Sequence, residues 1–259
     1  MTADALITAL DLPPGARVDR RVPKALLVEH GAPTPADRRH VNDAVEALLW
    51  VAALKPATIG VPVFRDEGRE YLEIAVLRMT LREAAVGARL TELVHRAVPY
   101  PVILCVDHLD CGPSSTIGVN LSAAHKRWSR GEAGQTVVDG DIVTVAWNRP
   151  SGEPSGAEMA ALSLSRQQHV SMLTVYQGWI DAFTAIAAAR VTGALRLLAS
   201  PEQAADRQAA LGELAAISRE VDRIRAAAKR ETQVALQVEL NVKLKAMQAR
   251  RAAAEERLR

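Results

Sequence analysis

A segment rich in proline and glycine constrains the fold of this chain more than any other feature. Residues 149–157 read Arg-Pro-Ser-Gly-Glu-Pro-Ser-Gly-Ala, and these residues interrupt regular structure because proline lacks an amide donor and glycine favours turns. Before the segment, short apolar runs alternate with turn residues, whereas the sequence after it has helical periodicity throughout. We therefore predict an α+β globular domain at 1–148, a linker at 149–157 and a helical arm at 158–259.

The globular domain is predicted to hold a mixed or mostly antiparallel sheet flanked by helices, because its elements lack the regular β-α-β alternation of a doubly wound fold. Residues 1–33 read as irregular, apart from a short strand at 25–28. Thr34 can serve as N-cap and Pro35 fits the first helical position, so a helix is expected from there to residue 54. The remaining predicted elements are strands at 59–64 and 71–81, a helix at 83–97, and strands at 102–106, 116–123 and 137–147.

The helical arm is predicted to contain a buried helix at about 162–199 and coiled-coil-like helices at about 202–250. Aliphatic residues recur there at the spacing of a coiled-coil seam. This seam either closes within the chain as an antiparallel hairpin or docks a partner chain or a second copy. The predicted partner-binding residues are Leu214, Ile217, Val221, Ile224, Leu236, Leu240 and Leu244.

Charge and hydropathy exclude some classes of partner. Lys and Arg number 32 and Asp and Glu 30, a net charge of +2, so a nucleic-acid site must be a local patch. No apolar run is long enough to span a bilayer, and no basic segment feeds an apolar stretch at the start. We therefore expect a cytoplasmic protein that has no membrane partner and keeps Cys105 and Cys111 reduced.

The sequence lacks the motifs that carry common catalytic chemistry. No lysine is followed by Ser or Thr, so there is no phosphate-binding loop, and the G-x-G-x-x-G, G-x-S-x-G and H-E-x-x-H patterns are absent. No carboxylate stands two residues before a lysine, an arrangement found in many metal-dependent nucleases. We predict no catalytic residue, no metal and no cofactor.

Two groups of side chains keep metal chemistry open as an alternative. Cys105, His108 and Cys111 have a spacing that resembles zinc sites, with His125 as a candidate fourth ligand, although a core cysteine followed by a polar turn explains them equally. Acidic residues also gather around a predicted hairpin at Asp66, Glu67, Glu70 and Glu73. A divergent metal-dependent nuclease would use Glu70 and Glu73, or Asp107 and Asp110.

Basic residues recur in three segments of the globular domain and suggest a nucleic-acid site. Arginine forks suit phosphate, and the neighbouring Trp128 could stack on an unpaired base. The alternative is scattered solubilising charge with Trp128 in the core. The candidate nucleic-acid-binding residues are Arg20, Arg21, Lys24, Arg38, Arg39, His125, Lys126 and Arg127.

Several segments together resemble an uncharacterised bacterial and archaeal family, number 4391 among the domains of unknown function. The resemblance spans nearly the whole chain and implies no catalytic residue. Members tend to be encoded near superfamily-2 helicases and DNA methyltransferases in anti-phage islands. The matching segments are Val18–Lys24, Asp37–Arg39, Trp50–Gly60, Tyr71–Ile74, His95–Pro101, Leu121–Arg127, Tyr176–Asp181 and Val238–Asn241.

These observations predict a non-catalytic accessory subunit of an anti-phage defence or restriction-like complex. Its expected partner is a helicase or methyltransferase of the same system, with nucleic acid as a further candidate. The alternatives are the divergent nuclease and a structural homodimer built on the helical arm.

Overall fold

The computed structural model describes residues 2–82, 86–109, 118–132, 134–147, 154–197, 201–231 and 233–258. The chain divides into two compact units, Met1–Phe183 and Thr184–Arg259. The first unit therefore extends beyond the predicted linker, of which the structure describes only residues 154–157. No helix within the described ranges is long and apolar enough to cross a membrane.

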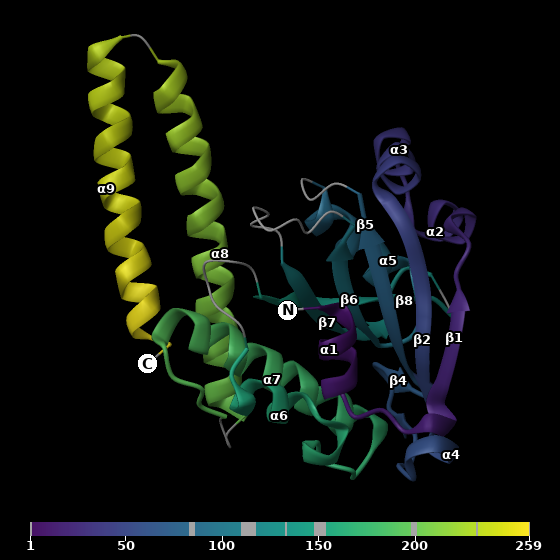
Figure 1. Ribbon diagram of the computed structural model, residues 1–259. Coiled ribbons are helices and arrows are strands. Elements are labelled where there is room, and N and C mark those ends of the chain that lie inside the picture. Colours follow the sequence, from purple (N-terminus) through teal and green to yellow (C-terminus); the bar gives the residue numbers. More distant parts are fainter. Residues whose placement is uncertain are drawn as a thin grey trace. The chain divides into compact units, whose positions relative to one another are not determined.

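The first unit is built on a mixed six-stranded sheet (Figure 1). Only β5 and β6 pair in parallel, and all other neighbouring strands are antiparallel. This confirms the prediction of an α+β fold with a mixed sheet. In spatial order the strands are β1 (Arg17–Arg21), β2 (Val45–Leu54), β5 (Ile74–Leu81), β6 (Val102–His108), β7 (Val119–Trp128) and β8 (Thr136–Trp147), with β3 (Phe64–Arg65) and β4 (Glu70–Tyr71) in a separate hairpin.

One face of the sheet is covered by α2 (Lys24–Gly31), α3 (Pro35–Ala44) and α5 (Gly87–Ala97). Alternate strand residues such as Leu77, Met79 and Leu104 point to this face and join Leu90 and Val94 of α5 in one buried apolar cluster. Burial of these aliphatic side chains fixes the register, because a shift by one residue would expose them.

The opposite face packs against α1 (Ala3–Ala9) and α7 (Met172–Thr192), with α6 (Gly156–Leu162) beside them. Arg78 of β5 points to this face and donates to Asp4 of α1 at 2.8 Å. The Trp179 indole of α7 donates to the Leu162 carbonyl oxygen at 2.7 Å. A helical turn, α4 (Pro56–Ile59), and 3-10 turns at Pro14–Ala16 and Leu164–Arg166 complete the unit.

Two of the predicted elements are wrong in type. Residues 25–28 lie in α2 and not in a strand, and the helix predicted from Thr34 ends at Ala44, after which 45–54 form β2. The N-terminal signal itself is confirmed, since the Thr34 hydroxyl accepts from the Asp37 amide at 3.1 Å. β2 was misread because a strand with apolar neighbours on both faces has a nearly continuous apolar sequence, which fits a helix equally well.

Residues 1–33, expected to be mainly irregular, contain α1 and β1 as well as α2. The remaining predicted elements of the first unit differ mainly in their bounds. The strand predicted at 59–64 is the end of α4 followed by β3, and the hairpin expected at Asp66–Gly68 joins β3 to β4. The predicted helix at 83–97 begins at Gly87, with 83–85 outside the described residues. The later strands match β6, β7 and β8. The helix predicted at about 162–199 is the shorter α7, which is preceded by the 3-10 turn at Leu164–Arg166.

The second unit contains α8 (Pro201–Arg230) and α9 (Val234–Glu256), which run antiparallel (Figure 1). Glu213 of α8 pairs with Arg250 at 3.5 Å and with Arg257 at 2.9 Å, across the open end of the hairpin. Ala210 and Leu214 of α8 share a buried cluster with Ala254 and Leu258. Of the arm predicted at 158–259, the part formed by α8 and α9 is therefore a helical hairpin, whereas α6 and most of α7 belong to the first unit.

Candidate functional site

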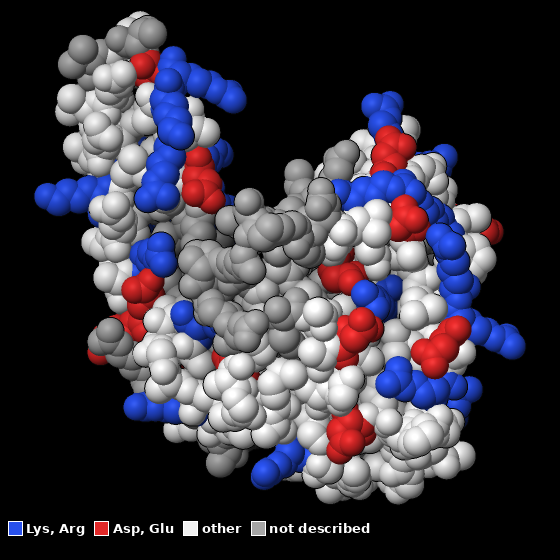
Figure 2. Space-filling model, in the orientation of Figure 1, with Lys and Arg blue, Asp and Glu red and all other residues white. Residues whose placement is uncertain are grey.

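A row of basic side chains runs over α3, α2 and β1 of the first unit (Figure 2). Its centre is the carboxyl end of α3, where the Lys24 ammonium donates to the Asn42 carbonyl oxygen at 3.3 Å. Arg82 donates to the Asp43 carbonyl oxygen at 3.0 Å, and Arg21 donates to that of Glu46 at 3.1 Å. Lys24 and Arg82 thus bind the last turn of α3, and Arg21 binds the start of β2 directly after it.

Lys24 and Arg82 in this basic row stabilise the carboxyl end of α3. The last carbonyl groups of a helix lack partners within the helix and carry partial negative charge, so cations stabilise them. Arg82 also forms an ion pair with Glu46. The pKa of Lys24 is lowered by partial burial and by the nearby charges of Arg82 and Arg21. These cations are therefore engaged with the protein and only partly free to bind a ligand.

Arg20, Arg38 and Arg39 are less engaged with the protein than Lys24, Arg21 and Arg82. All three are exposed, and none forms an ion pair with a residue that the structure describes, although Arg38 Nε donates to the Ala32 carbonyl oxygen at 3.4 Å. Arg38 lies one helical turn before Asn42 and Arg39 one turn before Asp43, so both continue the row along α3. Arg20 extends it on the edge strand β1. These three guanidinium groups are the part of the predicted nucleic-acid site that remains accessible.

Lys126 cannot contact a nucleic acid as predicted, because its side chain is only 1% exposed. Its ammonium donates to the carbonyl oxygen of His95 and, at 2.7 Å, to that of Val98, at the carboxyl end of α5. Burial lowers the pKa of Lys126 to about 8. The residue is a buried cap of α5, so the prediction that it binds phosphate is corrected.

His125 and Arg127 lie on the opposite face of β7 from Lys126, because successive strand residues alternate. The His125 ring is engaged on both nitrogens, with the Tyr71 hydroxyl 2.6 Å from Nδ1 and Gln177 Oε1 2.8 Å from Nε2. Arg127 forms an ion pair with Asp139 at 3.3 Å. The three consecutive residues predicted to form one basic group are therefore split between two faces.

His125 belongs to a hydrogen-bonded network that joins β4, β7 and α7. Gln177 Oε1 can only accept, so His125 Nε2–H donates to it, and Nδ1 then accepts from the Tyr71 hydroxyl, which itself accepts from the Lys126 amide at 3.3 Å. Gln177 in turn donates to Asp181 at 2.8 Å. Burial is the main cause that lowers the pKa of His125 and raises that of Asp181. Sequence spacing gives no sign of this network, because its residues come from distant segments.

The candidate metal-binding side chains do not converge in the described structure. Glu70 pairs with Arg65 and Glu73 with Lys55, so each carboxylate is neutralised by its own cation. Asp107 accepts from Thr80 at 2.8 Å and from Arg78. Within the described ranges, no group of three or more His, Cys, Asp or Glu side chains is placed to hold a metal ion.

Cys105, proposed as a zinc ligand, is a core residue. Its side chain is buried and its pKa is raised, mainly by burial, so the thiol is not poised to ionise or bind a metal. The pKa of His108 is lowered, mainly by burial. Asp110 and Cys111 lie outside the described residues. The part of the cluster that is described fits the alternative of a strand end.

The predicted partner-binding seam lies mainly inside the hairpin of the second unit. Leu214, Ile217, Val221 and Ile224 are at most 8% exposed along α8, which packs against α9. These four are therefore not free to dock a partner, because they form the internal seam that was the alternative interpretation. On α9, Leu240 and Leu244 are half-buried and Leu236 is 40% exposed.

The fold and its basic row define a class of α+β protein with a helical hairpin and without a recognisable catalytic cluster in the described residues. A family model described as a domain of unknown function (DUF4391) matches residues 10–250. The chain therefore belongs to this family. No curated protein and no solved structure matches the chain.

Proposed function

We propose that this chain is a non-catalytic accessory subunit of an anti-phage defence or restriction-like complex. It binds the phosphate backbone of a nucleic acid through the basic row, and it also binds a helicase or methyltransferase of the same system. The observation that carries the proposal is the set of exposed guanidinium groups of Arg20, Arg38 and Arg39, none of which has an ion-pair partner in the described structure. Such groups bind phosphate with two parallel hydrogen bonds.

The arrangement favours backbone contact over base recognition. The exposed guanidinium groups are on a helix surface and an edge strand, where they can follow a chain of phosphates without entering a pocket. The predicted stacking residue, Trp128, is half-buried. Lys126, two residues before it, is buried and donates to the Val98 carbonyl oxygen at the end of α5. Binding is therefore expected to depend weakly on base sequence and strongly on salt.

Reversal of charge on α3 tests the proposal. The double substitution Arg38→Glu and Arg39→Glu is expected to weaken binding to a labelled DNA strand of about 20 nucleotides by more than about tenfold, since it replaces two attractive contacts by repulsive ones. Fluorescence anisotropy at low salt measures the affinity of single-stranded and double-stranded forms.

The matched control is Arg219→Glu with Lys229→Glu, which changes the net charge equally at two exposed positions of α8. The control protein should bind like the wild type. Equal losses in both proteins, or no loss in the α3 variant, would show that the basic row on α3 is not the binding site.

The homodimer remains a second candidate because α9 presents apolar side chains to solvent. Leu236, Val238 and Val242 are 40%, 57% and 64% exposed, and such residues on a helix surface are typical of a seam that pairs with another helix. Light scattering should then report twice the mass of one chain, reverting to a single chain in the Val238→Gln and Val242→Gln variant. A monomeric wild type would remove this alternative.

A further inference from the structure

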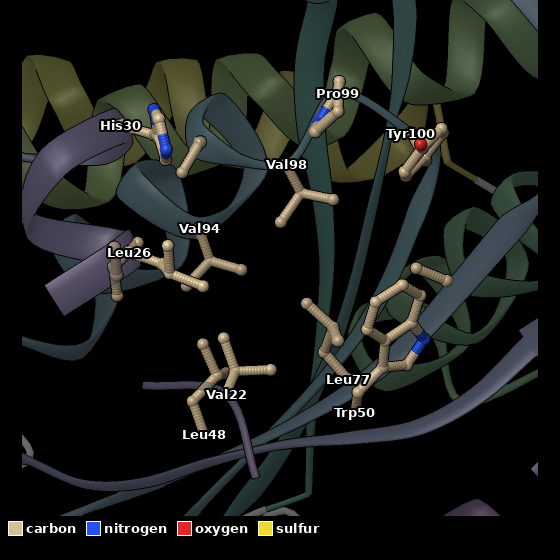
Figure 3. Close-up of a pocket in the computed structure, with 13 residues that line it drawn as sticks. Val22, Leu26, His30, Leu48, Trp50, Leu77, Val94, Val98, Pro99 and Tyr100 are labelled. Carbon is tan, nitrogen blue, oxygen red and sulfur yellow. The ribbon is translucent and has the colours of Figure 1, made fainter. Parts of the chain in front are cut away.

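The first unit contains an apolar pocket of about 260 Å³ between α2, α5 and the sheet. Val22, Leu48, Leu77, Val94 and Val98 point into a common space (Figure 3). The full lining comes from α2 and α5, from β2 and β5, and from the segments after β1 and α5, so the pocket has walls on several sides. It lies wholly within the first unit.

The lining selects an apolar ligand body. An apolar cavity of about 150 Å³ in a protein is large enough to bind benzene, and this pocket is larger. Its Trp50 indole N–H is already used, because it donates to the Ala52 carbonyl oxygen at 2.9 Å. A nucleobase placed here would leave most of its polar edge without partners, which is costly in a buried apolar site. An aliphatic chain meets no such penalty.

A cation is placed beside the pocket. Arg20 pairs with Trp50 across β1 and β2, and Trp50 lines the pocket. Val22, which directly follows β1 two positions after Arg20, also lines the pocket. The Arg20 guanidinium is exposed and has no ion-pair partner in the described structure. Tyr100, whose side chain also lines the pocket, is 38% exposed.

We propose that this pocket binds a small amphiphile with an aliphatic chain of medium length and one carboxylate. The chain fills the space between α2, α5 and the sheet, and the carboxylate takes two hydrogen bonds from Arg20. The volume is below the range of about 300 to 1,000 Å³ that drug-sized ligands occupy, so a short chain fits better than a long lipid. The pocket shares Arg20 with the proposed nucleic-acid site, but Arg38 and Arg39 lie on α3 and do not line the pocket, so substitution of these two residues separates the two kinds of binding.

Calorimetric titration with octanoate tests the proposal, with octylamine and octanol as ligands of equal chain length. Octanoate should bind at least about tenfold more tightly than either, because only the carboxylate pairs with Arg20. Shortening the chain to hexanoate should weaken binding about fourfold for each methylene removed. Arg20→Gln should abolish the preference for the carboxylate and still bind octanol like the wild type.

Two further variants give the test its controls. Arg17→Gln, on the same strand but paired with Asp19, should bind octanoate normally, whereas Val98→Phe should fill the pocket and abolish binding of all three ligands. The Arg38→Glu, Arg39→Glu protein should retain octanoate binding even if its DNA binding is lost. Equal affinity for the three ligands, or no saturable octanoate binding, would overturn the proposal. It would also be overturned if an acidic peptide with apolar side chains bound at this pocket and octanoate failed to displace it.

Discussion

Tyr176→Phe is expected to lower the free energy of unfolding by about 3 kcal/mol, although it removes a single oxygen atom. The Tyr176 hydroxyl is fully buried, accepts from the Ala124 amide at 3.0 Å and lies 2.8 Å from the Val102 carbonyl oxygen. The paired part of β6 and β7 ends with Ile103 opposite Ala123. Val102 and Ala124 are the next residues beyond that pair. The hydroxyl therefore takes the place of the next rung of the ladder.

The decrease in the free energy of unfolding is large because phenylalanine cannot form the hydrogen bonds of the Tyr176 hydroxyl, and water does not reach this buried site to replace them. A buried amide left without an acceptor costs about 1 to 3 kcal/mol, and the carbonyl group adds to this. Urea unfolding followed by tryptophan fluorescence measures the change. Tyr100→Phe is the control, since Tyr100 is exposed, and its effect should stay within about 0.5 kcal/mol. Similar small effects for both variants would contradict the role assigned to Tyr176.

Acid should destabilise the protein well above the range in which carboxylates titrate. His95 is fully buried, its Nε2 lies 2.9 Å from the Ser122 hydroxyl, and burial together with the charge of Lys126 lowers its pKa to about 3. Below about pH 6.5 His95 binds a proton in the unfolded chain but not in the folded protein. The free energy of unfolding therefore decreases as the pH is lowered. Between about pH 6.5 and 4.5 the loss of stability from this residue is about 2 kcal/mol.

Urea unfolding at a series of pH values from about 7 to 4.5 tests this expectation. The pKa values of His125 and His108 are also lowered, so their contributions have the same sign. His95→Gln removes one titrating group, and its stability should depend less steeply on pH than that of the wild type. An unchanged slope in the variant would show that His95 is protonated in the folded protein.

The sequence predicted the parts of the fold that depend on local chemistry. Thr34 and Pro35 located the start of α3 because capping and proline geometry act within a few residues. It did not predict that α3 ends at Ala44, since Val45–Leu54 is apolar on both faces and only the neighbouring strands and helices make it a strand. Tertiary burial overrides local periodicity at this point.

The candidate site was predicted in part for a similar reason. Arg20, Arg38 and Arg39 are exposed as expected, but consecutive residues on β7 diverge to two faces, which separates Lys126 from His125 and Arg127. A basic residue caps a helix only where the fold brings a helix end close to it. That proximity depends on contacts between segments distant in sequence, which local sequence patterns do not reveal. Arg82 was missed altogether, because only the fold brings it to the end of α3.

The salt dependence of DNA binding tests the central claim most directly. If Arg20, Arg38 and Arg39 each contact a phosphate of a single strand, the logarithm of the association constant should fall against the logarithm of salt concentration with a slope of about −2. In the Arg38→Glu, Arg39→Glu protein only the Arg20 contact remains, so the slope should shrink to about −0.7. A wild type that binds no DNA at low salt, or whose affinity is independent of salt, would contradict the account.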